Sequence, residues 1–246
     1  MSALAKLTWI EIKLFLRDPV AVVFALVLPV IFLFVLAEVF GGTQKGSIYR
    51  GVRPIDFYVP AYIGIAMASV GLISVPAQLA GYREAGILRR FRASSIPRWV
   101  VFGSQAILAL IVMTVTGAVM VGAAAAGYGL GRPESIGACA IAILLGACAV
   151  IALGLGLGTL LPSVRAAQLA GMILFFLSLL LSGAGPPPEM MTAALNRVAD
   201  FLPMTHVIRL IQGPWLNFGW DYTAMWVVLA MTAISVGLVM RFSNFR

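Results

Sequence analysis

The stretch of sequence that decides the fold is IGACAIAILLGACAVIALGLGLGTLL, residues 136–161, which contains no charged side chain. A helix needs about 20 consecutive, mostly apolar residues to cross the hydrocarbon core of a bilayer. Other stretches of the chain have the same character, so we predict six spans in all. Their ranges are 19–38, 57–80, 100–127, 136–161, 166–183 and 222–240.

The composition of the whole chain agrees with this interpretation. Of its 246 residues, 61% are hydrophobic and only 11% are charged, whereas a soluble domain carries about 25% charged residues. A transmembrane β-barrel would need alternating segments of about ten residues, and the sequence has none. Because open strands cannot cross hydrocarbon with unpaired amides, we predict an all-α membrane protein. The first apolar block is too long for a signal peptide, so we expect no cleaved leader.

The charges predict which side of the membrane each loop faces. With six spans, both termini lie on one side, and that side carries eleven basic and three acidic residues. The opposite side carries six of each, so the net charge of +8 lies on the terminal side. Cytoplasmic loops are enriched in Lys and Arg. We therefore predict a multi-pass protein with both termini in the cytoplasm. The membrane topology alone explains the excess of basic residues, so this excess does not indicate nucleic-acid binding.

The chain is predicted to form a single transmembrane domain over residues 1–246. One helical face before the first span is marked by Leu4, Leu7, Ile10 or Glu11, and Leu14, which is typical of a helix lying on the membrane surface. The predicted parts are a cytoplasmic interfacial helix (1–18), spans one to five (19–183), an outer re-entrant hairpin (184–219), and span six with a cytoplasmic tail (220–246).

Three residues within the spans predict local features. Pro29 falls in the middle of the first span and should kink that helix, because proline removes a helical hydrogen bond. Gly154 and Gly158 are spaced four residues apart, so they lie on the same face of the fourth span. This spacing is typical of a surface on which a second helix packs closely.

Residues 184–219 predict two short helices that are too brief to span. Pro186–Pro188 and Glu189 form a turn that starts the first helix with an acid at its positive end. Pro203 ends that helix, and Thr205 caps the second one. Such helices can dip into a membrane only where protein buries their ends. We predict an outer gate hairpin with these gate residues: Pro188, Glu189, Pro203, Thr205 and His206.

The motifs of catalysis are absent from the sequence. His206 is the only histidine, so no multi-histidine metal motif exists, and none of the three lysines lies in a phosphate-binding P-loop. Cys139 and Cys148 lie on opposite faces of one helix and cannot form a disulfide. We predict no catalytic residue, metal site or cofactor on this chain. Two interpretations of His206 stay open: a direct mechanistic role beside Arg209, or a residue that satisfies backbone groups at the helix break.

The polar residues inside the predicted spans are uncharged. They are Ser69, Ser74, Gln78, Gln105, Thr114, Thr116, Gln168 and Ser178. Carriers and proton pumps usually place ionisable groups near the membrane midplane, so the spans offer no proton relay. We expect the polar residues to form hydrogen bonds between helices, and the energy for transport to come from another chain.

Residues 81–99 form the most basic stretch of the terminal side. Three apolar residues share one helical face and three arginines surround them: Ile87, Leu88 and Phe91, then Arg89, Arg90 and Arg92. Two interpretations are open. The stretch is either a solvated basic loop that only sets the topology, or a short helix whose apolar ridge docks into the groove of a partner protein.

This stretch resembles the coupling helix of ABC-2 type exporter permeases, where a Glu-x-Gly-(Ile/Leu/Thr)-Leu-(Arg/Lys)-Arg-like run follows span two and contacts the nucleotide-binding subunit. The matching residues are Glu84, Gly86, Ile87, Leu88, Arg89, Arg90, Phe91 and Arg92. Other stretches resemble the family in the same order: Leu16–Pro19, Leu181–Gly183 with Pro186–Met190, and Phe201–His206. Three residues depart from the family pattern and leave the ends of the coupling and outer helices open: Ser95, Ile96 and Thr192.

The resemblance implies a transporter of two permeases, identical or paralogous, and two ABC ATP-binding subunits, in contact with membrane lipid. ATP and magnesium would bind on the partner ATPase, so this chain would not be an enzyme by itself. The likeness is closest to drug and antibiotic exporter permeases of the bacterial plasma membrane. It implies a hydrophobic or amphiphilic cargo, including lipid-like ones, moved out of the cytoplasm or inner leaflet. A lipid-linked polysaccharide exporter permease and an ATP-independent carrier or channel stay open as alternatives.

Overall fold

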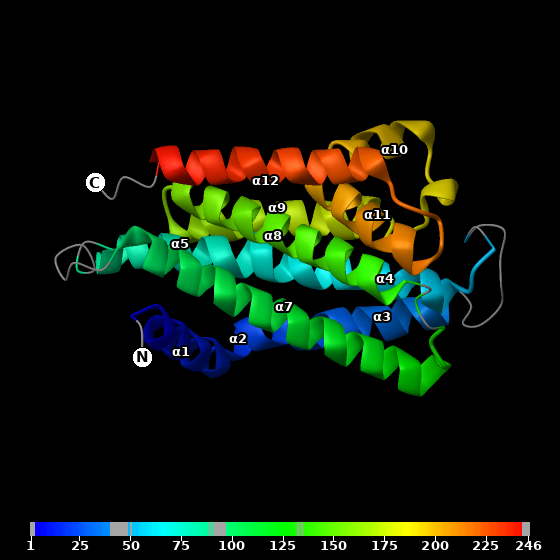
Figure 1. Cartoon of the computed structure of the whole chain (residues 1–246), viewed down its shortest axis with the longest axis horizontal. Coiled ribbons are helices and arrows are strands. Elements are labelled where there is room, and N and C mark those ends of the chain that lie inside the picture. The colour runs from blue at the N-terminus through cyan, green and yellow to red at the C-terminus, as the bar shows by residue number, and fades with distance from the viewer. Residues whose placement is uncertain are drawn as a thin grey trace.

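The protein is a bundle of helices (Figure 1). The structure is a computed structural model that describes residues 3–39, 49, 51–88, 90, 97–131, 133 and 135–242. Within these residues every regular secondary-structure element is a helix and no strand occurs. The all-α prediction is therefore confirmed for the described part of the chain.

Five helical segments of the described residues are long and apolar enough to cross a membrane. They correspond in position to the second to sixth predicted spans. They are Pro54–Glu84, Trp99–Tyr128 within α7 (Arg98–Tyr128), α8 (Ile136–Leu160), α9 (Val164–Leu181) and α12 (Tyr222–Phe242).

The predicted first span is divided into three elements. They are α2 (Pro19–Val22), the π-helical η1 (Val23–Val27) and α3 (Leu28–Val39). The apolar helical stretch here, Ala25–Val35, is shorter than the other five. A sixth full span therefore stays a prediction.

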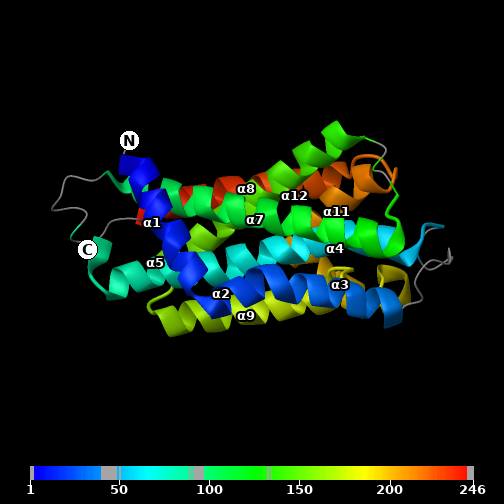
Figure 2. The ribbon, with the colours of Figure 1, turned by 90° about the horizontal axis from the view of Figure 1, so that it is seen from below.

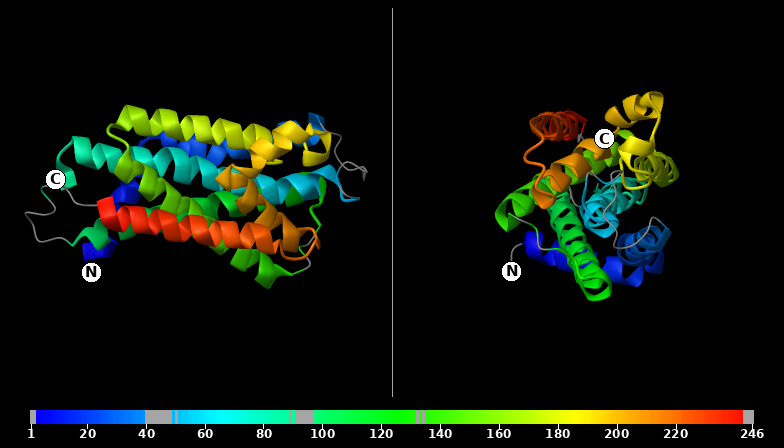
Figure 3. Two further views of the ribbon diagram at one scale, coloured as in Figure 1. Left: turned by 90° about the horizontal axis from the view of Figure 1, so that it is seen from above. Right: turned by 90° about the vertical axis from the view of Figure 1, so that its right-hand side faces the viewer.

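The segment Pro54–Glu84 lies at the centre of the bundle. It consists of α4 (Pro54–Ala68), the π-helical η3 (Ser69–Ser74) and α5 (Val75–Glu84), and the other helices surround it (Figures 2 and 3). Inside the chain 78% of its most apolar window is buried, against 17–44% for the other four segments. We term Pro54–Glu84 the central helix.

Each π-helical turn ends two residues before a proline, Pro29 after η1 and Pro76 after η3. Proline removes the hydrogen bond to the carbonyl four residues earlier, and π turns are one common way in which a helix accommodates such a break. The carbonyl oxygen that Pro29 leaves without a donor, Ala25 O, lies 3.1 Å from the Thr116 hydroxyl of α7. The helix is thus irregular where Pro29 predicts a kink, and the Thr116 hydroxyl, which also lies 2.8 Å from Val112 O, is a donor beside the freed carbonyl.

The fourth span touches the central helix at the two glycines predicted to form a close contact. A Cβ atom on Gly154 would collide with the carbonyl oxygen of Gly71, and one on Gly158 would lie 3.0 Å from the backbone of Pro76. Only a residue without a side chain allows the two backbones to approach so closely. The predicted packing surface is therefore confirmed.

The two ends of the bundle differ. α1 (Ala3–Arg17) lies at the same end as the C-terminal end of α12, the end of α5 and the start of α7 (Figure 1). We term it the terminal end. The opposite end, termed the hairpin end, carries η4 (Pro188–Met190), α10 (Ala193–Asp200) and α11 (Pro203–Trp215).

The two faces of α1 have different surroundings. Ile10 and Leu14 are exposed, as a helix on a membrane surface requires. The opposite face, with Thr8, Glu11 and Phe15, is buried where α1 packs along α7. The burial of an acidic residue on this face is not evident from the sequence pattern.

Candidate functional site

Arg83 binds the end of a neighbouring helix at the terminal end. Its Nη1 donates a hydrogen bond to Thr159 O at 2.9 Å, and its Nη2 donates to Leu161 O. Both carbonyls lie at the C-terminal end of α8, where carbonyl groups have no partner within their own helix. The guanidinium charge also complements the negative end of the helix dipole. Arg83 thereby joins the end of α8 to the end of α5.

Glu84 makes the complementary contact with the next helix. Its Oε1 accepts a hydrogen bond from Val164 N at 3.0 Å, and Val164 is the first residue of α9. A carboxylate is favourable here because the N-terminal end of a helix is positive. The Ser163 side chain caps the same helix by accepting from Ala166 N at 3.1 Å. Two successive residues of α5 therefore hold both sides of the α8–α9 connection.

The predicted coupling residues begin at this contact. Glu84 is the last residue of α5, and Gly86 has a φ of +66°, a conformation that suits glycine. The backbone is helical again at Ile87, Leu88 and Arg90, with Leu88 buried and Ile87 half-buried. Three further predicted residues lie outside the described part of the chain: Arg89, Phe91 and Arg92. The apolar ridge that includes Phe91 therefore stays a prediction.

Three side chains of α11 bind the C-terminal end of α10 within the predicted gate hairpin. The Thr205 hydroxyl donates to Ala199 O at 2.6 Å, and His206 Nε2 lies 2.9 Å from Asp200 O. Since a carbonyl only accepts, Nε2 carries the hydrogen. Arg209 forms an ion pair of 2.8 Å with the Asp200 carboxylate. These contacts make α10 and α11 one unit, and they match the interpretation in which His206 satisfies backbone groups at the helix break.

The turn before α10 is held by further side chains. Pro188 is the first residue of η4, and its carbonyl accepts from Asn196 Nδ2 at 3.0 Å. Glu189 lies in the same short turn and is exposed. Thr192, which departs from the family pattern, caps α10 by accepting from Leu195 N at 3.4 Å. A polar cap thus replaces the proline that the pattern often has here.

The second helix of the hairpin is inserted into the bundle. α11 begins at Pro203 and packs against α4, α8 and α12. A Cβ atom on Gly64 of α4 would lie 2.5 Å from Ile208, and one on Gly146 of α8 would lie 2.9 Å from Val207. α10, in contrast, lies on the outside of the bundle (Figure 1) and has few buried residues. The predicted hairpin is therefore present as two short helices, of which α11 is the buried one.

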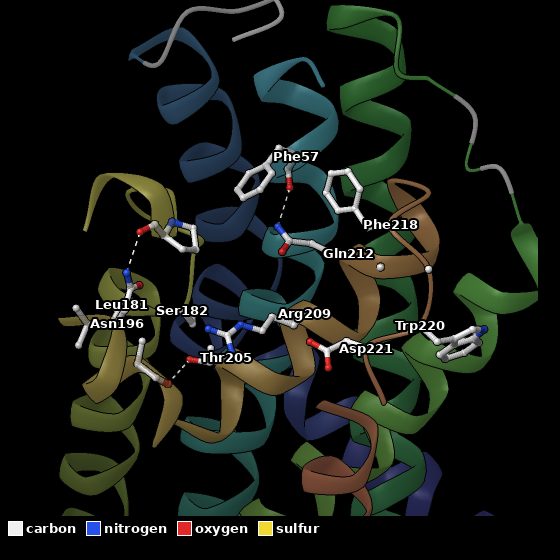
Figure 4. A pocket seen from close by; sticks show the side chains of 14 residues that line it. Phe57, Leu181, Ser182, Asn196, Thr205, Arg209, Gln212, Phe218, Trp220 and Asp221 are labelled. Atoms are coloured by element: carbon white, nitrogen blue, oxygen red, sulfur yellow. Dashed lines mark hydrogen bonds between the residues drawn. The ribbon is translucent and has the colours of Figure 1, made fainter. Parts of the chain in front are cut away.

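A cavity of about 470 Å³ lies between the hairpin and the start of α12 (Figure 4). Arg209 and Asp221 both line it, and the Asp221 carboxylate also caps α12 by accepting from Ala224 N at 2.9 Å. Its aromatic lining consists of Phe57, Phe218 and Trp220. Charged groups of both signs beside aromatic side chains suit a ligand group that is polar at one side and apolar at the other.

A second cavity, of about 760 Å³, is almost entirely apolar and lies between α7, α8 and α4. Its small residues include Gly117, Gly122 and Ala147, and its polar side chain is Thr114. The Thr114 hydroxyl donates to Leu110 O at 2.7 Å within α7, so it offers no free hydrogen to a ligand. This space suits a hydrocarbon chain.

The described residues contain no group of three or more His, Cys, Asp or Glu side chains that could hold a metal ion. Cys139 and Cys148 are both unpaired, with Cys139 buried and Cys148 exposed.

Comparison with protein families identifies the chain. The family model described as ABC-2 type transporter matches residues 2–216, which include α1 to α11 and thus both ends of the bundle. The chain belongs to the ABC-2 type transporter family. Among curated proteins, no relative matches it. This ABC-2 permease is therefore the membrane component of an ABC transporter, and permeases of this family normally work with an ATP-binding subunit.

The residue of the permease that sequence reasoning missed is Arg83, directly before the predicted coupling run. An arginine in the last turn of a helix is common because it complements the dipole of its own helix. Nothing in the local pattern indicates that Arg83 instead binds Thr159 and Leu161, more than 70 positions later. The structure adds this residue to the site and places Glu84, Gly86, Ile87 and Leu88 beside it.

Proposed function

We propose that the permease is the membrane half of an ATP-driven exporter, in which residues 84–92 dock onto the ATP-binding subunit. The observation that carries this proposal is the contact of Arg83 and Glu84 with the α8–α9 connection. Charge-assisted hydrogen bonds are about twice as strong as neutral ones, so a displacement of the docked segment is transmitted to α5, α8 and α9 together. ATP and magnesium bind on the partner, because the lysine contexts of this chain contain no P-loop.

The terminal end faces the cytoplasm of a bacterial cell in this proposal. Its support is the charge distribution, with an excess of basic residues on the predicted terminal side. The docking segment then meets the ATP-binding subunit, which is a cytoplasmic protein. The hairpin of α10 and α11 faces outward and acts as the outer gate, with Pro188, Glu189, Pro203, Thr205 and His206 within it.

The cargo is a hydrophobic or amphiphilic molecule, such as a drug, an antibiotic or a lipid-like compound. Two cavities support this choice. The apolar space between α7 and α8 suits a hydrocarbon part, and the cavity with Arg209 and Asp221 suits a polar part that leaves through the hairpin end. Export from the cytoplasm or the inner leaflet is what the resemblance to exporter permeases implies.

A second permease copy, identical or paralogous, packs beside α9 in this proposal. Only 28% of the apolar window of α9 is buried within the chain. Its exposed face contains Leu169, Ile173 and Leu180, and it also exposes the amide of Gln168. An amide is easier to accommodate against another helix, where it finds a hydrogen-bond partner, than against lipid.

Copurification with the ATP-binding protein encoded beside the permease tests the docking. We expect Arg90→Glu in the docking segment to lower recovery of the partner, and its stimulated ATPase activity, by about tenfold, since charge reversal at an interface is repulsive. Arg241→Glu is the matched control, because Arg241 is an exposed arginine in the last turn of α12. Equal recovery with both variants would show that the segment is a solvated loop, and transport without any ATP-binding subunit would favour a carrier or channel.

A further inference from the structure

Buried polar side chains meet where α1 packs against α7 and α5. Thr8 and Glu11 of α1 are 7% and 2% exposed, and Ser104 and Gln105 of α7 are 0% and 1% exposed. The Tyr82 hydroxyl of α5 interacts with the Glu11 carboxyl. An ionised carboxylate is costly to bury unless a cation or several donors compensate for the lost water. The protonation state of Glu11 is therefore the central question at this junction.

The contacts of Ser104 leave room for a proton on Glu11, because its single hydrogen can go either to the Glu11 carboxyl or to Val101 O. Ser104 Oγ lies 2.9 Å from Glu11 Oε1 and also 2.9 Å from Val101 O. A hydroxyl has a single hydrogen, and a backbone carbonyl can only accept one. When Ser104 donates its hydrogen to Val101 O, the short contact with Glu11 needs a hydrogen on the carboxyl group. The geometry therefore provides a place for a proton between Glu11 and Ser104.

The charges near the junction do not favour an ionised carboxylate. No cation among the described side chains pairs with Glu11: Ser104 and Gln105 of α7 are uncharged, and α2 has no charged residue. Tyr82 is the titratable group of α5 beside it. The basic residues of α1 are exposed: Lys6, Lys13 and Arg17. Arg83 and Glu84 of α5 are bound to the α8–α9 connection.

Burial raises the pKa of Glu11 to about 7, and the contacts with Ser104, Tyr82 and Gln105 offset only part of this shift. The Gln105 amide lies near enough to favour the ionised form but does not reach hydrogen-bonding geometry, since both its amide atoms and Glu11 Oε2 are buried without a partner. A cavity of about 10 Å³ adjoins Gln105, about the space that one water molecule needs. The polar groups that would rearrange on loss of the proton are thus already in place.

We propose that Glu11 is a proton-binding site that holds α1 against the end of α5 and the start of α7. The reaction is a simple equilibrium in which the carboxylate takes up one proton from the adjoining aqueous phase to become the neutral acid. With the proton bound, α1 stays docked. When the proton leaves, a negative charge is buried with no cation beside it among the described side chains, and α1 moves outward until water reaches it.

The consequence of this equilibrium lies close to the docking segment. Tyr82, which contacts Glu11, is directly before Arg83 in α5, and Arg83 holds the end of α8. Proton loss therefore removes the contact of α1 with the end of α5. α5 is the helix that connects the ATP-binding subunit to α8 and α9. The proton site rests on the packing of α1 alone, whereas its effect on export rests on the proposed function.

Infrared titration of the full chain in lipid nanodiscs tests the site without any partner protein. We expect the C=O stretching band of a protonated carboxyl to disappear with a midpoint near pH 7, far above the ordinary Glu value of 4.5. The band should be missing in Glu11→Gln and retained in the control Glu38→Gln, because Glu38 is exposed. A wild-type midpoint near 4.5, or a band that persists in Glu11→Gln, would overturn the proposal.

Thiol labelling tests the movement of α1. In a background of Cys139→Ala and Cys148→Ala, we compare Thr8→Cys, at a buried position, with Trp9→Cys, at an exposed position of the same helix. The ratio of their labelling rates should rise about fivefold between about pH 6 and pH 8, because ionisation of Glu11 frees α1. With Glu11→Gln the ratio should stay constant. The same rise in both backgrounds would show that α1 moves independently of this proton.

Discussion

The two ends of the central helix each carry an arginine and an acid, but the two pairs are arranged differently. At the hairpin end, Arg53 and Asp56 bind one another, with Nε to Oδ2 at 2.6 Å, and Arg53 Nη2 also donates to Gly129 O at 3.0 Å. At the terminal end, Arg83 binds the end of α8 while Glu84 binds the start of α9. The first pair is bonded to itself and to one connection, since Asp56 Oδ1 also accepts from Gly131 N at 3.1 Å. The second pair is divided between two helices.

This difference suggests a different role for each end. An ion pair within one helix turn, with added bonds to Tyr128 O, Gly129 O and Gly131 N, fixes that end against a single neighbouring segment. Two charged residues that each bind a separate helix transmit movement, because neither can shift without moving its partner helix. The mobile connection thus lies beside the docking segment, and the fixed one lies at the hairpin end. Four predictions test this contrast.

The largest effect is expected from Arg83→Gln. The end of α8 loses two charge-assisted hydrogen bonds, each worth about 1.5–3 kcal/mol, so the displacement of α5 no longer reaches α8. Transport per ATP hydrolysed in the reconstituted transporter should fall at least about tenfold, since about 1.4 kcal/mol corresponds to a factor of ten. The partner ATPase should still copurify. Unchanged transport per ATP would mean that this contact is only structural.

The next effect concerns the pH dependence of stability, which should arise at the terminal end. The folded-state pKa of Glu11 is raised to about 7 from an ordinary value of 4.5. The contribution of the protonated Glu11 to the free energy of unfolding is therefore fully present below about pH 4.5. It is lost as the pH rises through about 7, up to a limit of about 3 kcal/mol. The melting temperature of the wild type should therefore fall between about pH 6 and pH 8, while that of Glu11→Gln stays level. A parallel fall in both proteins would assign the titration to another group.

Arg53→Gln should affect stability but not coupling. Loss of a partly buried ion pair and its bond to Gly129 should cost about 1–2 kcal/mol, which lowers the melting temperature by a few degrees. Transport per ATP hydrolysed should stay within about twofold of the wild type. Loss of coupling in Arg53→Gln as large as in Arg83→Gln would remove the distinction between the two ends.

The smallest effect is expected from Glu84→Gln. The amide oxygen can still accept from Val164 N, so only the interaction of the charge with the helix dipole is lost, worth about 0.3–1 kcal/mol. Transport per ATP should fall by about twofold to fivefold, and Glu84→Ala, which removes the acceptor as well, should fall further. An equal loss in both variants would show that the charge, and not the acceptor, matters.

The sequence predicts the membrane class, five of the long apolar helices and the general position of the hairpin, because these depend on local composition and on proline punctuation. The contact at Gly154 is likewise visible in a four-residue spacing. The site is less predictable. Arg83 and Glu11 both have ordinary local contexts, and their roles depend on helices that lie far away in the sequence. The predicted first span at 19–38 gives no sign of the π turn at Val23–Val27, which divides it.

The roles of the predicted docking and gate residues stay predictions. The structure places Glu84, Gly86, Ile87 and Leu88 at the terminal end, and it explains Thr205 and His206 as partners of the α10 carbonyls. Both explanations concern the stability of the fold. Their functional roles require partner chains and conformational change, which the sequence of one chain does not specify.

The joint movement of α5 and α9 is tested most directly by the distance between these two helices during ATP binding. Spin labels at the exposed positions Ala85 and Gln168, in a chain without its two cysteines, report this distance in the complex with the ATP-binding subunit. We expect the same narrow distance distribution with and without ATP, and a broad one in the double variant Arg83→Gln, Glu84→Ala. A wild-type distance that changes on ATP binding would contradict a rigid connection through Arg83 and Glu84, because α5 and α9 would then move independently.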